Sequence, residues 1–191
     1  MNNLENLILK ALEQLNKLNS EQISNLVEIK EASSKSLLSI LINEHIVDEE
    51  TFFDVLSDIY RRGNADIDDI STDLQVDQKR FIEHVCKKFK ITFFDLDDID
   101  IDYRISEKLS TAQLKTYSAI PVKEDEISVY VAFKNPFDVI AQDKVQNLFN
   151  RKLLKVACAD PAQIEKYINK VALNESIKDV ITEIRRELSS S

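Results

Sequence analysis

Apolar residues recur every three or four positions through most of the first ninety residues, which predicts a series of amphipathic helices. We expect one helix within residues 4–18, a second beginning at Ser20, and a third opened by the Ser33-Ser34 pair. The first helix carries an apolar stripe made of Leu4, Leu7, Ile8, Leu12, Leu15 and Leu18. A helix must bury such a stripe, either against the following helices or against a partner protein, and the pattern leaves both open.

Residues 35–90 show one helical pattern twice, with an offset of twenty-nine residues. Val47-Asp48 precedes apolar positions at Phe52-Phe53 and Leu56, and Val76-Asp77 precedes the matching positions at Phe81-Ile82 and Val85. Aspartate is a favoured N-cap, so each copy predicts a helix that begins just after it. We therefore expect a tandem helical repeat, with "RRGNADIDD" as the connection between the copies.

From about residue 91 the pattern changes to short extended runs. "ITFFDL" is one such run, and "SAIPV" and "ISVYVAF" are joined by the polar "KEDE", which predicts a hairpin. A helical segment then leads to "KLLKVACA". Strand–helix–strand over this length favours a parallel pair. We expect about three strands, flanked by helices, within residues 91–172.

Two strand ends in this half resemble each other. "VYVAFKNPFDVIAQDKV" and "KVACADPAQIEKYINKV" both place an Asn-Pro or Asp-Pro pair between a strand and a helical run. Asn135 and Asp160 are favoured N-caps, and Pro136 and Pro161 would then occupy the first helical position, where the missing N–H costs nothing. We predict that both pairs are strand-to-helix corners with a structural role.

Together these patterns predict an α+β protein. A helical tandem-repeat region is followed by a small three-stranded α/β domain with strand-(Asn/Asp)-Pro-helix corners. The expected segments are a helical extension at residues 1–34, the repeat at 35–90, the α/β domain at 91–172, and a linker helix at 173–191.

Composition excludes several classes of function. The 191 residues include one glycine, Gly63. Loops that cradle phosphates need several glycines, so no Walker loop or dinucleotide fingerprint can be drawn. We assign no catalytic and no cofactor-binding residue, and we expect no enzyme activity from this chain.

Charge is unevenly spread. The net charge is −9, and residues 44–102 hold 17 acidic and 7 basic side chains. A basic nucleic-acid footprint is absent, so we expect no nucleic-acid partner. No apolar stretch approaches the roughly 20 residues of a membrane span, and no signal peptide is recognisable, so we expect a cytoplasmic location.

No metal site is predicted. A calcium loop counted from Asp95 in "DLDDIDID" would need a glycine at Asp100 and a glutamate at Ser106, and it fails at both. His45, His84, Cys86 and Cys158 have no metal-ligand spacing. The two cysteines are expected to be partly buried free thiols.

The order of these parts resembles the N-terminal region of the type II secretion and type IV pilus assembly ATPases, the general secretion pathway protein E family. The resemblance covers roughly residues 35–172, from the helical repeat through "AIPVKEDEISVYVAFKNPFDVIAQDKVQNL" to "KVACADPAQIEKYI". It implies an adaptor or regulatory region in front of a hexameric ATPase motor. The Walker motifs, the bound ATP and Mg²⁺, and the hexamer would all belong to that motor, whose motifs are not in these residues.

The resemblance also implies a possible ligand, because some members bind cyclic di-GMP through the helical repeat. Their Arg-Leu-Gly signature falls with the Arg at Ser36 and the first Gly at Leu38; a later Gly falls at His45, and at Leu74 in the second copy. Every one of these positions is replaced. The arginine that would contact guanine or phosphate is missing, and side chains stand where glycine would let the ligand approach the backbone.

Two functions of different classes follow. The leading one is an interaction module that docks on the cytoplasmic domain of an inner-membrane platform or adaptor protein, which would make the chain peripheral at that membrane through its partners. The apolar stripe of the first helix supplies the candidate interface residues. The alternative is a cyclic di-GMP-sensing module of the same family, against which the replaced signature residues count.

Overall fold

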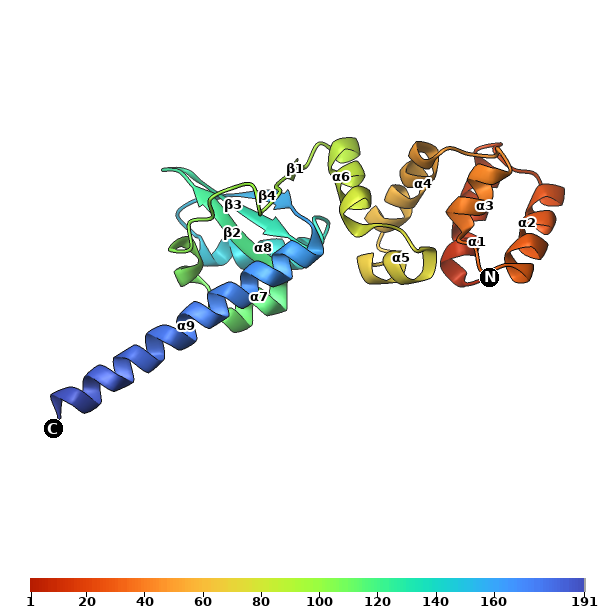
Figure 1. The fold of residues 1–191 in the computed structure, drawn as a ribbon. Coiled ribbons are helices and arrows are strands. Elements are labelled where there is room, and N and C mark those ends of the chain that lie inside the picture. The colour runs from red at the N-terminus through yellow and green to blue at the C-terminus, as the bar shows by residue number, and fades with distance from the viewer. Residues whose placement is uncertain (191) are drawn as a thin grey trace. The chain divides into compact units, whose positions relative to one another are not determined.

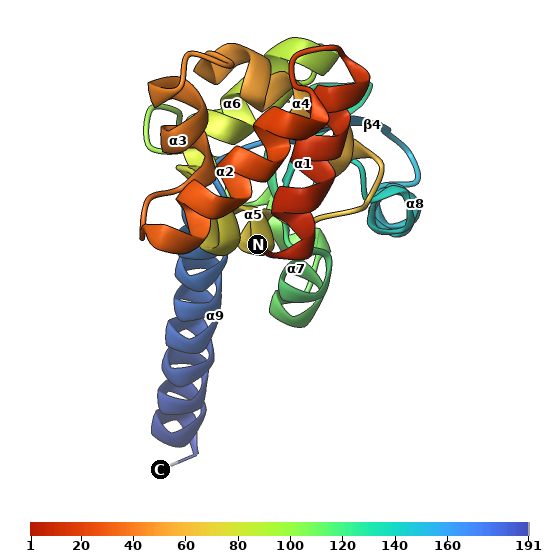
Figure 2. The same ribbon diagram turned by 90° about the vertical axis from the view of Figure 1, so that its right-hand side faces the viewer.

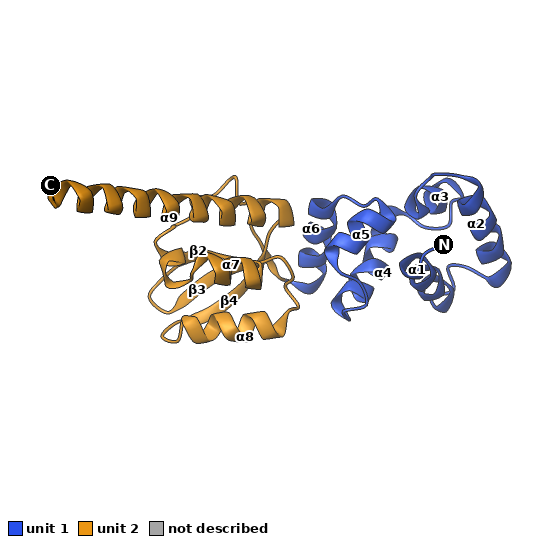
Figure 3. Ribbon diagram, turned by 90° about the horizontal axis from the view of Figure 1, so that it is seen from below, with its two compact units in different colours: residues 1–90 blue, residues 91–191 orange. Residues whose placement is uncertain are grey.

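The computed structural model describes residues 1–190. The chain divides into two compact units, Met1–Lys90 and Ile91–Ser191 (Figure 3). Ser191, the last residue of the predicted linker helix, lies outside the described residues. The first unit is helical and the second combines helices with a sheet, so the predicted α+β class is confirmed. The predicted boundary at residues 34 and 35 stays a prediction, and residues 1–34 fold into the same unit as the repeat.

The helices of the first unit begin at short polar side chains. They are α1 (Asn3–Gln14), α2 (Ser20–Ala32), α3 (Leu37–Asn43), α4 (Glu49–Arg61), α5 (Ile67–Leu74) and α6 (Gln78–Phe89). Asp48 and Asp77 cap α4 and α6 as predicted, each accepting a hydrogen bond from the third helical N–H. Two predicted starts were wrong: Asn19 caps α2 in place of Ser20, and Ser36 caps α3 in place of the Ser33-Ser34 pair.

The corrected start of α2 has a clear local cause. The Asn19 side chain accepts from the Gln22 N–H at 2.8 Å, and the Gln22 side chain accepts from the Asn19 N–H at 2.9 Å. This reciprocal capping box satisfies two N–H groups that lack partners within the helix, which a cap at Ser20 could not do.

Within residues 1–190, five helices end at a residue other than glycine in the left-handed conformation. These residues are Asn16, His45, Gln75, Lys90 and Ser118, with φ between 46° and 57°. Gly63, with φ of 78°, follows α4 in the same way. Glycine is the usual residue there because it has no Cβ to collide with the neighbouring carbonyl. The scarcity of glycine therefore has a structural cost at these helix ends.

We expect His45→Gly to raise the free energy of unfolding by about 0.5–1 kcal/mol, since relief of the left-handed strain outweighs the extra freedom of the unfolded chain. The control is Glu44→Gly, one residue earlier, where φ is −83° and glycine brings only its entropic cost. Urea unfolding followed by circular dichroism measures both. A lower stability for His45→Gly would contradict the prediction.

The second unit holds a mixed sheet of four strands (Figure 1). They are β1 (Thr92–Phe93), β2 (Ala119–Glu124), β3 (Ser128–Phe133) and β4 (Leu153–Cys158), in the order β1-β4-β3-β2. β2 and β3 form the predicted antiparallel hairpin, and β4 runs parallel to β3 as predicted. The expected count of three is corrected to four, because the "ITFFDL" segment pairs with β4 through two residues.

The helical segments of this unit are η1 (Ile105–Lys108), α7 (Thr111–Tyr117), α8 (Val139–Leu148) and α9 (Pro161–Ser189). One predicted corner is confirmed: the Asp160 side chain accepts from the Ala162 N–H at 3.1 Å, and Pro161 opens α9. The other was wrong. Asn135 accepts from the Phe137 N–H at 2.9 Å, which closes a turn, and α8 begins only after Asp138. Pro136 stays in that turn, because Asp138 offers a later cap that bonds the Ala141 N–H at 3.0 Å.

The apolar core of the second unit includes Val131, Phe133, Leu114, Ile120 and Val145. The first half of α9 packs on this core through Ile164, Tyr167, Ile168 and Val171. The helix then continues without a break past residue 172, where the sequence placed the end of the α/β domain. Figures 1 and 2 show its second half extending beyond the rest of the unit.

Candidate functional site

The apolar stripe predicted in the first helix is placed mostly inside the helical unit. Leu4, Ile8, Leu12 and Leu18 are buried, and Ile8 and Leu12 have no exposed surface. Leu7 is half-buried, and Leu15 is 56% exposed. Four of the six candidates thus stabilise the core of this unit, and Leu15 and part of Leu7 offer surface to a partner. Their role as an interface stays a prediction.

The positions of the cyclic di-GMP signature have other structural roles. The Ser36 hydroxyl accepts a hydrogen bond from the Ser39 N–H at 3.2 Å and so caps α3. His45 is exposed at the left-handed end of α3, with φ of 55°. In the second copy the left-handed residue is Gln75, and Leu74 is buried within α5. The left-handed residue of the second copy thus follows the glycine position assigned to Leu74 by one residue, and that assignment stays a prediction.

A polar groove of about 590 Å³ runs between α4 and α6, the second helices of the two repeat copies. In it, His84 Nε2 lies 2.7 Å from Asp54 Oδ1. Lys88 Nζ donates to the Asp54 carbonyl at 3.0 Å and lies 3.3 Å from Asp58 Oδ1. The Phe53 ring contacts the His84 ring edge-on, with centroids 5.6 Å apart. The sequence shows no metal-ligand spacing for His84 and no sign of this pairing; the repeat offset indicates only that α4 and α6 correspond.

The groove has the chemistry of a recognition surface. The residues that line it are Glu49, Glu50, Phe53, Asp54, His84, Lys87 and Lys88, with Arg80 donating to Glu49 at its margin. Among these described residues there is no hydroxyl or thiol that could act as a nucleophile. Charged pairs beside an aromatic ring are suited to contacts with a peptide or a protein surface.

An acidic edge lies along α5. It consists of Asp66, Asp68, Asp69 and Asp73, all exposed. The negative charge of Asp66 is the main cause that raises the pKa of the Asp69 carboxyl; loss of hydration and the negative charge of Asp73 raise this pKa further. One oxygen of the Asp66 carboxylate already accepts a hydrogen bond, from the Asp69 N–H at 2.8 Å. The negative charges of these carboxylates repel one another, and contact with a positively charged surface would reduce that repulsion.

The acidic stretch "DLDDIDID" is held to α9 by hydrogen bonds and so has a structural role in the second unit. Gln163 of α9 accepts from the buried Leu96 N–H at 2.9 Å and donates to Asp95 at 2.8 Å and Asp97 at 3.2 Å. Asp97 also accepts from Lys166 at 2.8 Å, and this bond is the main cause of its lowered pKa. Because the pKa of Asp97 is lower in the folded chain than in the unfolded chain, these hydrogen bonds stabilise the fold above about pH 4. Their contribution decreases as the pH falls further.

The remaining candidate groups lie apart from these surfaces. Cys86 and Cys158 are buried thiols that are not joined in a disulfide. Within residues 1–190 no group of three or more His, Cys, Asp or Glu side chains could hold a metal ion. None of the helices in the described part of the chain is long and apolar enough to cross a bilayer.

Comparisons with known proteins give a family match and several similar structures. Residues 89–176 match the MshEN domain. The chain is similar to the solved structure of MshE with cdg (cyclic di-GMP), with 13% identity and a TM-score of 0.45 over 90% of this chain and 99% of that one. It is also similar to the N-terminal domain of XpsE in two crystal forms, with 16% identity and TM-scores of 0.39 and 0.40, over 88% of this chain and 96% and 97% of those chains. No curated protein sequence matches the chain.

Proposed function

We propose that this chain is the adaptor region of a secretion or pilus ATPase. The match of residues 89–176 to the MshEN domain supports this proposal, together with the resemblance to the N-terminal region of these ATPases. In this proposal it docks the motor on the cytoplasmic domain of an inner-membrane platform or adaptor protein. The chain itself hydrolyses no nucleotide, and ATP turnover belongs to the motor that the resemblance implies. The chain reaches the membrane surface only through this partner.

The observation that supports docking is the acidic edge of α5. Four exposed carboxylates lie within eight residues, and their mutual repulsion already raises the pKa of Asp69. A basic patch on the partner would neutralise them, and complementary charge of this kind speeds association and selects the partner. Leu15, exposed on α1, can add an apolar contact.

The test is the affinity of the chain for the platform protein's cytoplasmic domain, measured by biolayer interferometry at low and high salt. We expect Asp69→Asn with Asp73→Asn to weaken binding roughly three- to tenfold, and salt to weaken it as well. The matched control is Glu21→Gln with Glu28→Gln, two exposed acids of α2 that remove the same charge elsewhere on the unit. Binding unaffected by both salt and the α5 changes would refute the acidic edge as the docking surface.

Cyclic di-GMP sensing is the alternative within the same family. MshE has been solved with cdg, but in this chain the positions of the ligand signature have other roles. Ser36 caps a helix and has no guanidinium, and His45 places a side chain where the ligand would meet bare backbone. The residues therefore favour docking over nucleotide sensing.

A further inference from the structure

The second half of α9 has an apolar stripe that its own unit leaves uncovered. It consists of Leu173, Ile177, Val180, Ile181, Ile184 and Leu188, whose exposed fractions lie between 44% and 70%. At 100° per residue these side chains fall within one sector roughly 100° wide, over a helix length of about 22 Å. We call this set the α9 stripe.

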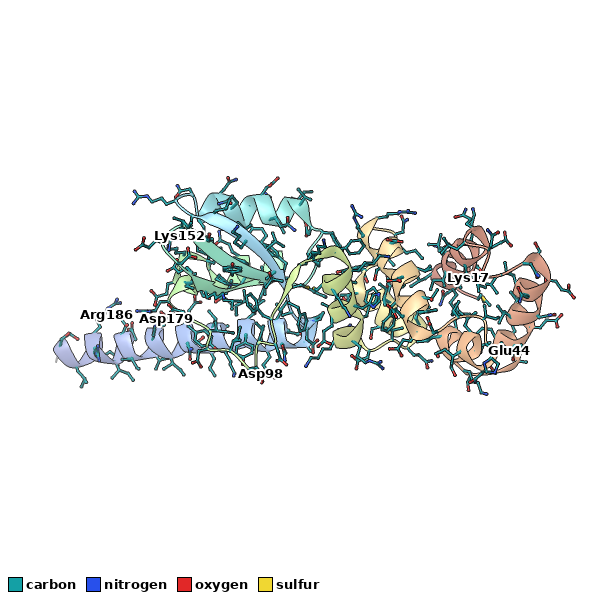
Figure 4. The ribbon with its side chains drawn as sticks, turned by 90° about the horizontal axis from the view of Figure 1, so that it is seen from above. Lys17, Glu44, Asp98, Lys152, Asp179 and Arg186 are labelled. Carbon is teal, nitrogen blue, oxygen red and sulfur yellow. The ribbon has the colours of Figure 1, made fainter. Side chains whose placement is uncertain are left out.

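The α9 stripe is separate from the face that holds the helix to its unit. The buried side chains Ile164, Tyr167, Ile168 and Val171 define that face. The helical repeat places the α9 stripe roughly 140° around the axis from them. Figure 4 shows the side chains of this part of α9, including those labelled Asp179 and Arg186, projecting from a helix that extends past the sheet. The core of the unit therefore lies on the other side of α9 from most of the stripe, and only Ile177, at its first turns, borders a pocket shared with Tyr103 and Glu107.

The two borders of the α9 stripe carry opposite charges. Lys178 and Arg185 follow the edge formed by Ile181 and Leu188. Glu183 and Glu187 follow the opposite edge, next to Val180. Lys178 lies 3.4 Å from Glu107, and Glu183 lies 3.5 Å from Arg186, both at exposed sites where ion pairs contribute little. Within residues 1–190, Arg185 and Glu187 form no ion pair.

We propose that the α9 stripe binds a second copy of this chain, with the two α9 helices parallel and in register. When two identical helices face each other in the same direction, the basic border of one lies beside the acidic border of the other. Arg185 of each copy then lies about 3 Å along the axis from the level of Glu183 and Glu187 on its partner. In an antiparallel pair, basic would face basic and acidic would face acidic.

The pairing is short, so the dimer is reversible. The contact between the two α9 stripes, which we call the seam, covers about two heptads. Coiled coils of that length are weak by themselves. Because the face of α9 that packs on the core of the second unit points roughly 140° away from the stripe, the sheet of that unit does not lie across the contact between the two helices. The dimer goes beyond the proposed docking function and does not depend on it.

Sedimentation equilibrium of the whole chain tests the seam. We expect a monomer–dimer equilibrium, and we expect Ile177→Asp with Ile184→Asp to raise its dissociation constant by at least about 100-fold, because two charges per copy would be buried unpaired. Thr182→Asp is the matched control, since Thr182 is exposed on the opposite side of α9, and it should change the constant by less than about threefold. A chain that stays monomeric up to about 500 µM, or a dimer that the seam variant leaves intact, would overturn the proposal.

Two further variants test the orientation. Ile177→Cys and Leu188→Cys should each form a disulfide with its own copy in a parallel dimer, whereas one antiparallel register can bring at most one of these positions near itself. Arg185→Glu should weaken a parallel dimer roughly three- to tenfold and should strengthen an antiparallel one. The native Cys86 and Cys158 are buried, so the unchanged chain is the control for crosslinking. Crosslinking at only one position, or a tighter Arg185→Glu dimer, would contradict the parallel arrangement.

Discussion

Replacing Leu12 by alanine should lower the free energy of unfolding of the helical unit by about 2–5 kcal/mol, whereas Leu15→Asp should change it by less than about 0.5 kcal/mol. Both leucines belong to the stripe predicted from the sequence. Leu12 has no exposed surface, so truncation leaves a cavity in the core between the helices. Leu15 is 56% exposed, and an aspartate there remains hydrated.

Urea unfolding of the two variants, followed by far-ultraviolet circular dichroism, measures this contrast. The same proteins then report on docking, because Leu15→Asp weakens partner binding only if Leu15 contacts the partner. A large loss of stability for Leu15→Asp, or none for Leu12→Ala, would show that the helices of the first unit are packed differently from this structure.

Gln163→Ala should destabilise the second unit by about 1–3 kcal/mol. The amide of Gln163 satisfies the buried Leu96 N–H and at the same time donates to Asp95 and Asp97. Alanine leaves that N–H without a partner in a place that water does not reach, and it frees the acidic stretch from α9.

Gln163→Glu separates the two roles of this side chain. Glutamate can still accept from the Leu96 N–H, but its charge repels Asp95 and Asp97, so its destabilisation should diminish as pH falls and the carboxyls protonate. Thermal unfolding between pH 4 and pH 8 measures this, with Gln163→Ala as the reference. A Gln163→Glu variant whose deficit is constant over this range would contradict the arrangement of these groups.

Local signals made most of the fold predictable. The aspartate caps at Asp48 and Asp77 and the Asp160-Pro161 corner depend on side chains next to the backbone they bond, so the sequence alone locates them. The hairpin of β2 and β3 follows from two extended runs joined by a short polar connection. These features involve residues that are neighbours in the chain.

The predictions of secondary structure were wrong where two local signals compete, or where an element depends on pairing with a residue that is distant in the sequence. Asn135 and Asp138 are both good caps three residues apart, and only the turn closed by Asn135 decides that α8 begins after the second. β1 is two residues long and is a strand only because β4 lies beside it. The sequence located the apolar stripe of the first helix, but which of its leucines face the core depends on how α1 packs against its neighbours.

The candidate surfaces were harder to predict than the fold. The His84–Asp54 contact joins residues thirty positions apart on two repeat copies, and no pattern around either residue marks it. The acidic character of residues 44–102 was evident from composition. The structure adds that one part of this charge forms the exposed edge of α5 and another part is used in hydrogen bonds to α9.

The most direct test of the docking function is the affinity of this chain for the platform protein's cytoplasmic domain, determined by calorimetry with and without saturating cyclic di-GMP. We expect binding with the same dissociation constant in both titrations, because the resemblance places the Arg and a Gly of the nucleotide signature at Ser36 and His45, which cap α3 and end it in the left-handed conformation. Absence of binding in both titrations, or binding that appears only when the nucleotide is present, would contradict it.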